Sequence, residues 1–163
     1  MSKVIVLGAP LTGKTSLTHA LREQVEISVL DFDEELLKLN NGRYPANYPV
    51  LNKQLKDRVI ENVSTMKEVI FFAFEIEIEA LRRLEQDNFM IVQLTAPLEV
   101  LKARNQERLK NDPDNDAFQY VTKNLEYQNK VKELGLVDLI IDTSTEGLND
   151  SLKSIIQMSL TSK

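Results

Sequence analysis

The sequence has no cysteine and a single histidine among its 163 residues. The absence of cysteine excludes disulfide bonds, zinc–cysteine sites, iron–sulfur clusters and a thiolate nucleophile. With one histidine, a Ser-His-Asp triad and multi-histidine metal sites are poorly supported. His19 lies between Leu17 and Leu21 on an expected helix, and we expect it to have a structural role.

Long apolar runs and an excess of basic residues are also missing. Residues 4–7 are too few for a signal-peptide core or a membrane span, and the run 69–74 is interrupted by Glu75. With 20 Lys+Arg against 25 Asp+Glu, the net charge of -5 argues against nucleic acid as a partner. The sequence therefore predicts a cytoplasmic protein with neither a membrane nor a nucleic-acid partner, and residues 1–163 as one domain.

What is present is an alternation of short apolar runs with longer amphipathic stretches. Strands without internal polar alternation, separated by helices, are typical of a parallel sheet covered on both faces. We therefore predict an α/β fold, a three-layer sandwich with a five-stranded parallel sheet. The expected strands are 3–7, 28–31, 69–74, 90–94 and 137–141, and the expected helices are 14–24, 32–39, about sixteen residues around 51–63, a stretch around 78–84, 98–109, 118–134 and one from about 148.

A glycine-rich motif follows the first expected strand and opens the first expected helix. Residues 8–15 fit G-x-x-x-x-G-K-[ST] without a mismatch, which happens by chance on the order of once in a few hundred chains of this length. Its glycines let the backbone amides wrap a phosphate, and the helix dipole adds to the attraction. We call residues 8–15 the phosphate loop, and expect the loop and the next residue to bind a nucleotide, with Lys14 on the β- and γ-phosphates and Thr15 on Mg²⁺: Gly8, Ala9, Pro10, Leu11, Thr12, Gly13, Lys14, Thr15 and Ser16.

The string Gly-Ala-Pro-x-x-Gly-Lys-Thr resembles the phosphate loop of the small P-loop kinases, the adenylate-kinase and shikimate-kinase group. The order of elements, the length, an arginine-bearing helix after the fourth strand and a short lid around 105–118 resemble the same group. Two positions depart from it: Leu11 replaces a usual glycine, and residues 72–75 carry neither of the motifs common after the third strand. The resemblance implies a P-loop NTPase fold, ATP and Mg²⁺ as cofactors, and phosphoryl transfer to a small acceptor.

Two carboxylates stand at the expected end of the second strand. Asp31 and Asp33 are two residues apart, so in an extended segment both point to one side, at the sheet edge where open α/β sheets bind ligands. The resemblance implies that Asp31 holds Mg²⁺ through water and that Asp33 orients or deprotonates the acceptor hydroxyl. The alternative is that one of them only caps the helix that begins near Glu34.

Two arginines share one face of the helix that leads into the lid. Arg104 and Arg108 are four residues apart. In the resembling kinases such a pair clamps the phosphates and neutralises charge on the transferring group. The alternative is that they are solvated and pair with Glu99 or Glu107.

Further candidates flank the expected cleft. Arg43, Arg58 and Glu75 are candidates for binding the acceptor, and Glu75 is also a candidate for water-mediated Mg²⁺ binding. By the resemblance, Asp142 and Thr143 after the fifth strand lie near the nucleotide base.

Two functions follow from these patterns. The first is an ATP·Mg²⁺-dependent phosphotransferase acting on a hydroxyl metabolite, a nucleoside or a nucleoside monophosphate. The alternative is a nucleotide-binding regulator or weak NTPase without a small-molecule acceptor. The lid arginines favour the enzyme, because a passive binder has no transferring phosphoryl group to neutralise. The acceptor, the choice between ATP and GTP and the oligomeric state stay open.

Overall fold

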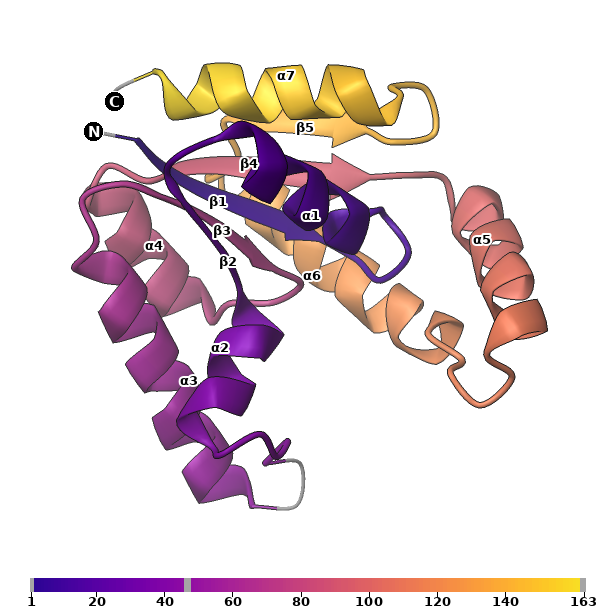
Figure 1. The fold of residues 1–163 in the computed structure, drawn as a ribbon, viewed down its shortest axis with the longest axis horizontal. Helices are drawn as coiled ribbons and strands as arrows, with labels where there is room; N and C mark the ends of the chain where they lie inside the picture. The colour runs from indigo at the N-terminus through magenta and orange to yellow at the C-terminus, as the bar shows by residue number, and fades with distance from the viewer. Residues whose placement is uncertain (1, 46–47, 162–163) are drawn as a thin grey trace.

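The computed structural model describes residues 2–45 and 48–161, and its centre is a five-stranded parallel sheet. The strand order is β2-β3-β1-β4-β5 (Figure 1). Every neighbouring pair is parallel, which confirms the predicted fold class. The strands are β1 (Lys3–Gly8), β2 (Ser28–Asp31), β3 (Val69–Ala73), β4 (Met90–Thr95) and β5 (Leu139–Asp142).

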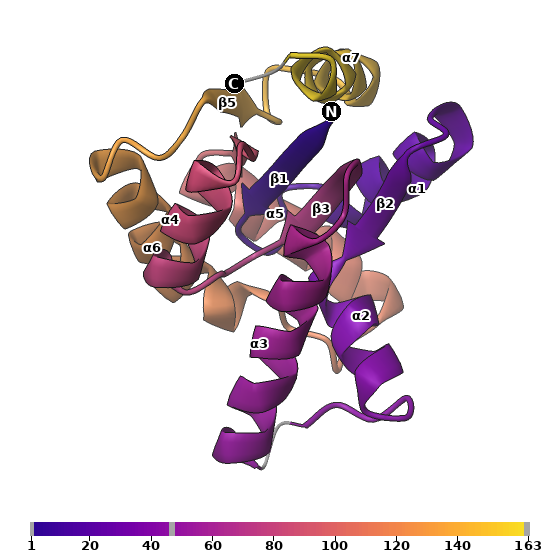
Figure 2. The ribbon, with the colours of Figure 1, turned by 90° about the vertical axis from the view of Figure 1, so that its left-hand side faces the viewer.

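Helices cover both faces of this sheet, and alternate strand residues supply the two cores. Val4 and Val6 pack with residues of α1 and α7. Ile5 and Leu7 point the other way and pack with residues of α2, α3, α4 and α6, and both helical layers can be followed in Figures 1 and 2. Because both faces are covered, the central strands contain almost no polar residue. The helices are α1 (Lys14–Gln24), α2 (Phe32–Leu39), α3 (Pro49–Ser64), α4 (Ile78–Gln86), α5 (Leu98–Asn111), α6 (Val121–Glu133) and α7 (Leu148–Ser159).

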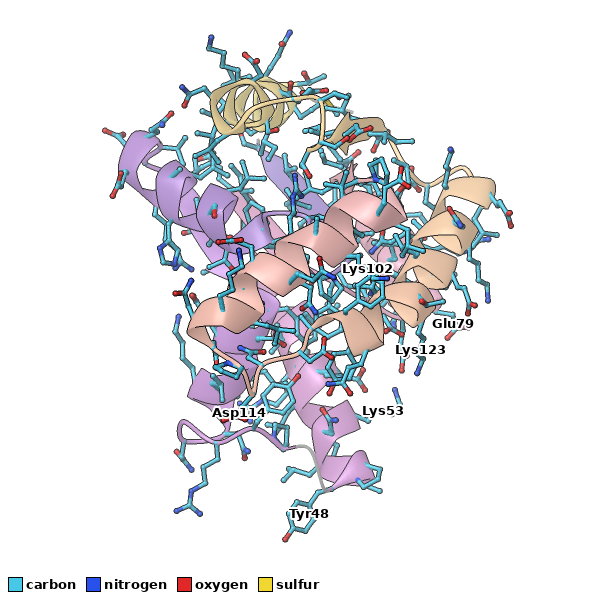
Figure 3. All side chains as sticks on the ribbon, turned by 90° about the vertical axis from the view of Figure 1, so that its right-hand side faces the viewer. Tyr48, Lys53, Glu79, Lys102, Asp114 and Lys123 are labelled. Atoms are coloured by element: carbon cyan, nitrogen blue, oxygen red, sulfur yellow. The ribbon has the colours of Figure 1, made fainter. Side chains whose placement is uncertain are left out.

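Element boundaries differ from the sequence predictions at a few ends. Strand β3 stops at Ala73, so Phe74 and Glu75 belong to the following loop. Helix α5 continues to Asn111, and a 3-10 turn, η1 (Phe118–Tyr120), precedes α6. The predicted lid therefore consists of the end of α5 and a connection of only a few residues. Figure 3 labels Asp114 at the tip of this connection.

The carboxyl ends of β1, β2 and β3 bring three loops to one edge of the sheet. Strand β1 lies between β3 and β4, so the phosphate loop leaves the middle of the sheet. This is where open parallel sheets bind ligands. Within the described residues, no helix is both long and apolar enough to cross a membrane.

Candidate active site

The phosphate loop begins with a close contact that only glycine permits. A Cβ on Gly8 would lie 2.6 Å from Thr12 Oγ1 and 3.1 Å from Leu94 Cβ. The Thr12 hydroxyl is fully buried and donates to the Ala9 carbonyl at 2.7 Å. This internal hydrogen bond folds the loop back on itself beneath the start of α1.

Leu11 adopts a backbone conformation that favours glycine. Its φ is 70°, and that of Gly13 is 98°. A left-handed conformation costs a leucine about 1 kcal/mol, and two contacts hold it there. The Leu11 side chain packs against a small core of Ala96, Leu101 and Val121, and its carbonyl accepts a hydrogen bond from Arg104 at 2.9 Å. The departure from the usual glycine is therefore accommodated by packing between the phosphate loop, α5 and α6.

Lys14 lies against the phosphate loop. Its ammonium donates to the Gly8 carbonyl at 2.6 Å and to the Ala9 carbonyl at 2.9 Å. Burial lowers the pKa of Lys14 to about 8, although the charges of Asp31 and Asp33 act in the opposite direction. The loop therefore places a desolvated ammonium near two carboxylates, a combination of charges that can hold a triphosphate together with a divalent cation.

The two arginines of α5 have different surroundings. The Arg104 guanidinium donates to the Leu11 carbonyl, to the Thr143 hydroxyl at 3.0 Å and to the Thr143 carbonyl at 2.7 Å. Arg108 is exposed and lines the cleft described below. Its guanidinium makes no hydrogen bond or ion pair with the described residues. Neither arginine pairs with Glu99 or Glu107 within the described part of the chain. Arg104 braces two loops, and only Arg108 faces the cleft.

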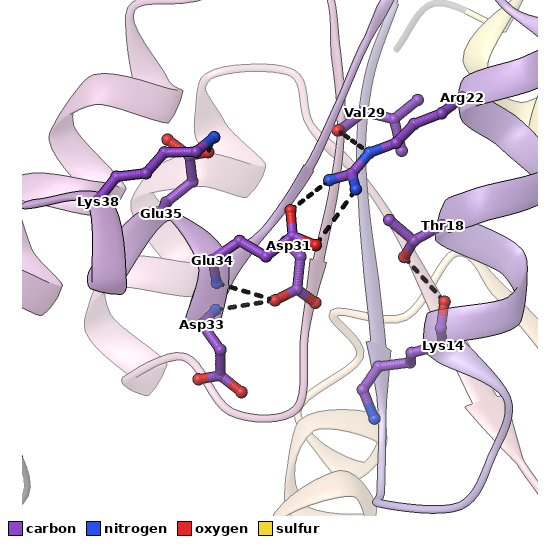
Figure 4. A network of polar contacts seen from close by, with 9 residues as sticks. All are labelled: Lys14, Thr18, Arg22, Val29, Asp31, Asp33, Glu34, Glu35 and Lys38. Carbon is purple, nitrogen blue, oxygen red and sulfur yellow. Dashed lines mark hydrogen bonds and ion pairs between the residues drawn. The ribbon is translucent and has the colours of Figure 1, made fainter. Parts of the chain in front are cut away.

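Asp31 and Asp33 also differ in what they contact. Asp31 caps α2: its Oδ1 accepts from the amides of Asp33 at 3.0 Å and Glu34 at 3.2 Å (Figure 4). Both bonds go to Oδ1, so Asp31 caps α2 with one of its two carboxylate oxygens. Asp33 accepts a hydrogen bond from the Tyr44 hydroxyl at 3.3 Å. Burial raises the pKa of both carboxyl groups, and for Asp33 the neighbouring charge of Asp31 adds to the effect.

Lys14, Asp31, Asp33 and Arg108 line one cleft of about 730 Å³. It joins the phosphate loop, the start of α2 and the lid. The lining includes Pro10, Leu11, Gly13, Lys14, Thr15, Ser16, His19, Asp31, Asp33, Tyr44, Phe74, Arg108 and Tyr120.

A second pocket of about 320 Å³ adjoins the cleft, and we call it the α3 pocket. Asp33, Tyr44 and Phe74 line both spaces. The other walls come from α3, the loop after β3 and the start of α4. They comprise Phe32, Pro49, Asn52, Lys53, Lys56, Asp57, Ile60, Glu75, Ile76, Glu77 and Ala80. Asp33 is thus the carboxylate at the junction of the two spaces.

Amide side chains of α6 hold the loop after β3 against the α3 pocket. The Phe74 carbonyl accepts from Asn124 Nδ2 at 2.7 Å and Gln128 Nε2 at 3.0 Å. The Tyr127 hydroxyl accepts from the Ile76 amide at 3.0 Å and donates to the Ile76 carbonyl at 2.7 Å. Asn124 and Gln128 are buried, so these bonds fix an otherwise irregular loop.

A third pocket of about 310 Å³ lies on the other side of Leu11. Ser16, Arg104 and Thr143 line it. Asp142 is not in this lining, because its carboxylate accepts from the amide and hydroxyl of Ser144 within its own turn. Of the two residues predicted near the base, the structure brings Thr143 to this pocket and turns Asp142 away.

Of the three residues predicted to bind the acceptor, only one lines a pocket. Glu75 lines the α3 pocket. Arg43 and Arg58 are exposed and line none of the three spaces. Arg43 sits beyond α2, where its carbonyl accepts from Asn40. His19 is also exposed and lines the cleft, and the structural role expected for it stays a prediction.

Sequence reasoning gave no role to Tyr44, Asn52 and Lys56, although all three line the α3 pocket. No spacing rule connects them: Tyr44 reaches Asp33 across eleven positions, through the loop that follows α2. The charge of Lys56 lowers the pKa of Asp33, against the larger opposite effect of burial. A buried carboxylate is expected to have a hydrogen-bond donor nearby, but the sequence alone does not say which residue that donor belongs to.

The residues present suit a magnesium ion that arrives with a nucleotide. Among residues 2–45 and 48–161, no cluster of three or more His, Cys, Asp or Glu side chains forms a metal cage. Mg²⁺ in nucleotide sites takes one or two protein oxygens, with phosphates and waters supplying the rest. The Thr15 hydroxyl and Asp31 line the same cleft, and Asp31 Oδ2 takes no hydrogen bond from the described residues.

A loop with the motif G-x-x-x-x-G-K-[ST] lies between a central parallel strand and a helix, at the carboxyl edge of the sheet, and this arrangement is a P-loop α/β fold. No protein-family model and no curated sequence matches the chain. Solved structures do. Shikimate kinase from Acinetobacter baumannii in complex with shikimate aligns with a TM-score of 0.72 at 19% identity, over 98% of this chain and 93% of that one.

Two further structures align over nearly the whole length. A gluconokinase from Sinorhizobium meliloti 1021 has a TM-score of 0.62 at 13% identity, over 98% of this chain and 91% of that one. The tunicamycin resistance protein of Deinococcus radiodurans has a TM-score of 0.61 at 21% identity, over 99% and 98%. The chain thus has the fold of the small P-loop kinases.

Proposed function

We propose that the protein transfers the γ-phosphoryl group of ATP, bound with Mg²⁺, to a hydroxyl group of a small-molecule acceptor. The observation that carries the proposal is the position of Asp33. It lines both the cleft of the phosphate loop and the α3 pocket. The α3 pocket would place an acceptor hydroxyl beside Asp33 and next to the nucleotide. A binding protein without an acceptor does not require this arrangement.

The nucleotide would occupy the cleft and the third pocket. The amides of the phosphate loop and the positive end of the α1 dipole favour the phosphates, and Lys14 adds a charge there. Arg108, which faces the cleft, is suited to neutralise charge on the transferring group. The base would lie in the third pocket beside Arg104 and Thr143.

Mg²⁺, held by Thr15 and Asp31, would neutralise charge on the β- and γ-phosphates. Asp33 would accept the proton of the acceptor hydroxyl while the hydroxyl oxygen forms a bond to the γ-phosphorus. The bond from that phosphorus to the β,γ-bridging oxygen would break at the same time, and ADP would leave. Burial raises the pKa of Asp33 and makes it a stronger base than a surface carboxylate. The Tyr44 hydroxyl, which donates to Asp33, would fix the orientation of the carboxylate.

An ADP-release assay over nucleosides, nucleotides and small hydroxy compounds tests this proposal. We expect at least one acceptor to raise the rate above slow basal hydrolysis, and Lys14→Ala to abolish that increase. Full turnover by Lys14→Ala would overturn the active-site assignment. Slow hydrolysis that no acceptor in a broad panel accelerates would overturn the kinase proposal in favour of a nucleotide-binding regulator.

A further inference from the structure

The α3 pocket has an acidic wall, and we infer from it that the acceptor is an uncharged or cationic hydroxyl compound, not a carboxylate or a phosphate ester. This inference rests on the proposed phosphotransfer. It concerns the charge class of the molecule that fills the pocket beside Asp33. The solved neighbours include a shikimate kinase and a gluconokinase, which are named for acidic compounds, so the inference predicts an acceptor of a different charge class for this chain.

The charged residues of the pocket are unbalanced. Four carboxylate side chains line it, against two lysines: Asp33, Asp57, Glu75 and Glu77, with Lys53 and Lys56. The ammonium of Lys53 lies 3.3 Å from Asp57 and 3.6 Å from Glu77, so its charge is already matched. This leaves Asp33 and Glu75 with one further lysine in the lining, Lys56. Glu75 makes no ion pair within the described part of the chain.

Arginine, the residue best suited to bind a carboxylate or phosphate, is missing from this wall among the described residues. Recognition of a carboxylate or phosphate favours the planar fork of arginine. No arginine lines the pocket among the described residues. Arg43 and Arg58, the two that the sequence offered, lie elsewhere, and the undescribed residues 46–47 are Ala and Asn, which carry no charge. A triphosphate in the adjoining cleft would add further negative charge and oppose an anionic acceptor.

One residue of the pocket wall has a buried hydrogen-bond acceptor without a donor among the described residues. The Oδ1 atom of Asn52 is buried and has no hydrogen-bond partner in the described structure, although Asn52 lines the pocket. A buried acceptor without a donor is costly. If the Asn52 amide turns toward the pocket, a hydroxyl or ammonium group of an acceptor would supply that donor, whereas an ionised carboxylate has no hydrogen to give.

The rest of the wall suits the carbon skeleton of a small metabolite. Phe32, Ile60 and Phe74 contribute apolar surface to the lining. A volume of about 320 Å³ lies at the lower end of the range of small-molecule pockets. The chemistry therefore fits a compact polyol, amino alcohol, amino sugar or nucleoside with one hydroxyl directed at Asp33.

Matched acceptors of different charge test the inference. We suggest glucitol, glucosamine and gluconate as one set, and adenosine with its 5′-monophosphate as a second, inside the broad ADP-release panel. We expect the neutral or cationic members of a productive set to exceed the anionic member at least tenfold in kcat/KM. Preference for the anionic member would overturn the inference and leave the kinase proposal standing. No acceptor-dependent turnover anywhere in the panel would overturn the kinase proposal itself.

A charge reversal provides the second readout. Glu75→Lys should raise the anionic-to-cationic ratio of kcat/KM at least tenfold. Glu79→Lys is the matched control, because Glu79 is exposed and lines none of the three spaces; it should leave the ratio within twofold. Equal shifts in the two variants would show that the α3 pocket does not read the acceptor charge, and the inference would fail.

Discussion

The protonation of Lys14 predicts how nucleotide affinity depends on pH. Burial against the Gly8 and Ala9 carbonyls lowers the Lys14 pKa to about 8 in the free protein. A bound triphosphate favours the charged form and raises that pKa again. Above pH 8, binding therefore requires the uptake of a proton, and the affinity falls as the pH rises.

The expected effect is large enough to measure. A group with a pKa of about 8 is about 90% protonated at pH 7 and about 10% protonated at pH 9, so the dissociation constant should rise about tenfold between them. Phosphate groups, with a second pKa near ~6, are ionised throughout this range. Titration calorimetry with a Mg²⁺-bound, non-hydrolysable ATP analogue gives the dissociation constant. Repeating it in two buffers of different ionisation enthalpy counts the protons taken up.

The matched variant is Lys14→Arg, whose guanidinium stays charged up to pH 9. Its affinity should be lower overall because the fork does not fit the same carbonyls, but it should not change with pH between 7 and 9. A flat profile for the native protein, or an equal slope for Lys14→Arg, would refute the assignment of the proton to Lys14.

Three other predictions concern the scaffold around the phosphates. Arg108→Ala should lower acceptor-dependent kcat by about 10²–10³ with an unchanged melting temperature, whereas Arg104→Ala should cost about 1–3 kcal/mol of stability by removing donors from the half-buried carbonyls of Leu11 and Thr143; equal behaviour would contradict the distinction. Gly8→Ala should lower the melting temperature through ~1–3 kcal/mol of overpacking, and Thr12→Ala in that background should restore part of it. In urea unfolding, Leu11→Gly should be more stable than Leu11→Ala by about 1 kcal/mol, and the reverse order would remove the argument for a constrained left-handed leucine.

The sheet and the phosphate loop were predictable because their signals are local. Buried parallel strands require apolar runs, and the loop requires glycines at fixed spacing, so both are readable within about ten residues. The errors at strand and helix ends have a local cause as well. Phe74 continues the apolar run of β3 in sequence, but its carbonyl bonds to α6 instead of the sheet.

The distribution of roles among charged residues was not predictable from the sequence. Arg104 and Arg108 share a helix face, yet Arg104 is taken up by Leu11 and Thr143, which lie 93 and 39 positions away. Asp31 and Asp33 both line the cleft, yet α2 engages only Asp31 as its cap. Such choices depend on tertiary contacts between distant segments, and spacing along the chain does not report them.

The most direct test of the central claim is the acceptor-dependent turnover of Asp33→Asn with the best acceptor of the panel. The account predicts a fall in kcat of about 10²–10⁴, as expected for the loss of a general base, with an unchanged affinity for the Mg²⁺-bound ATP analogue. Detection of the phosphorylated acceptor by mass spectrometry would separate transfer from hydrolysis. Native turnover by Asp33→Asn would contradict the claim that phosphoryl transfer takes place at the junction of the cleft and the α3 pocket.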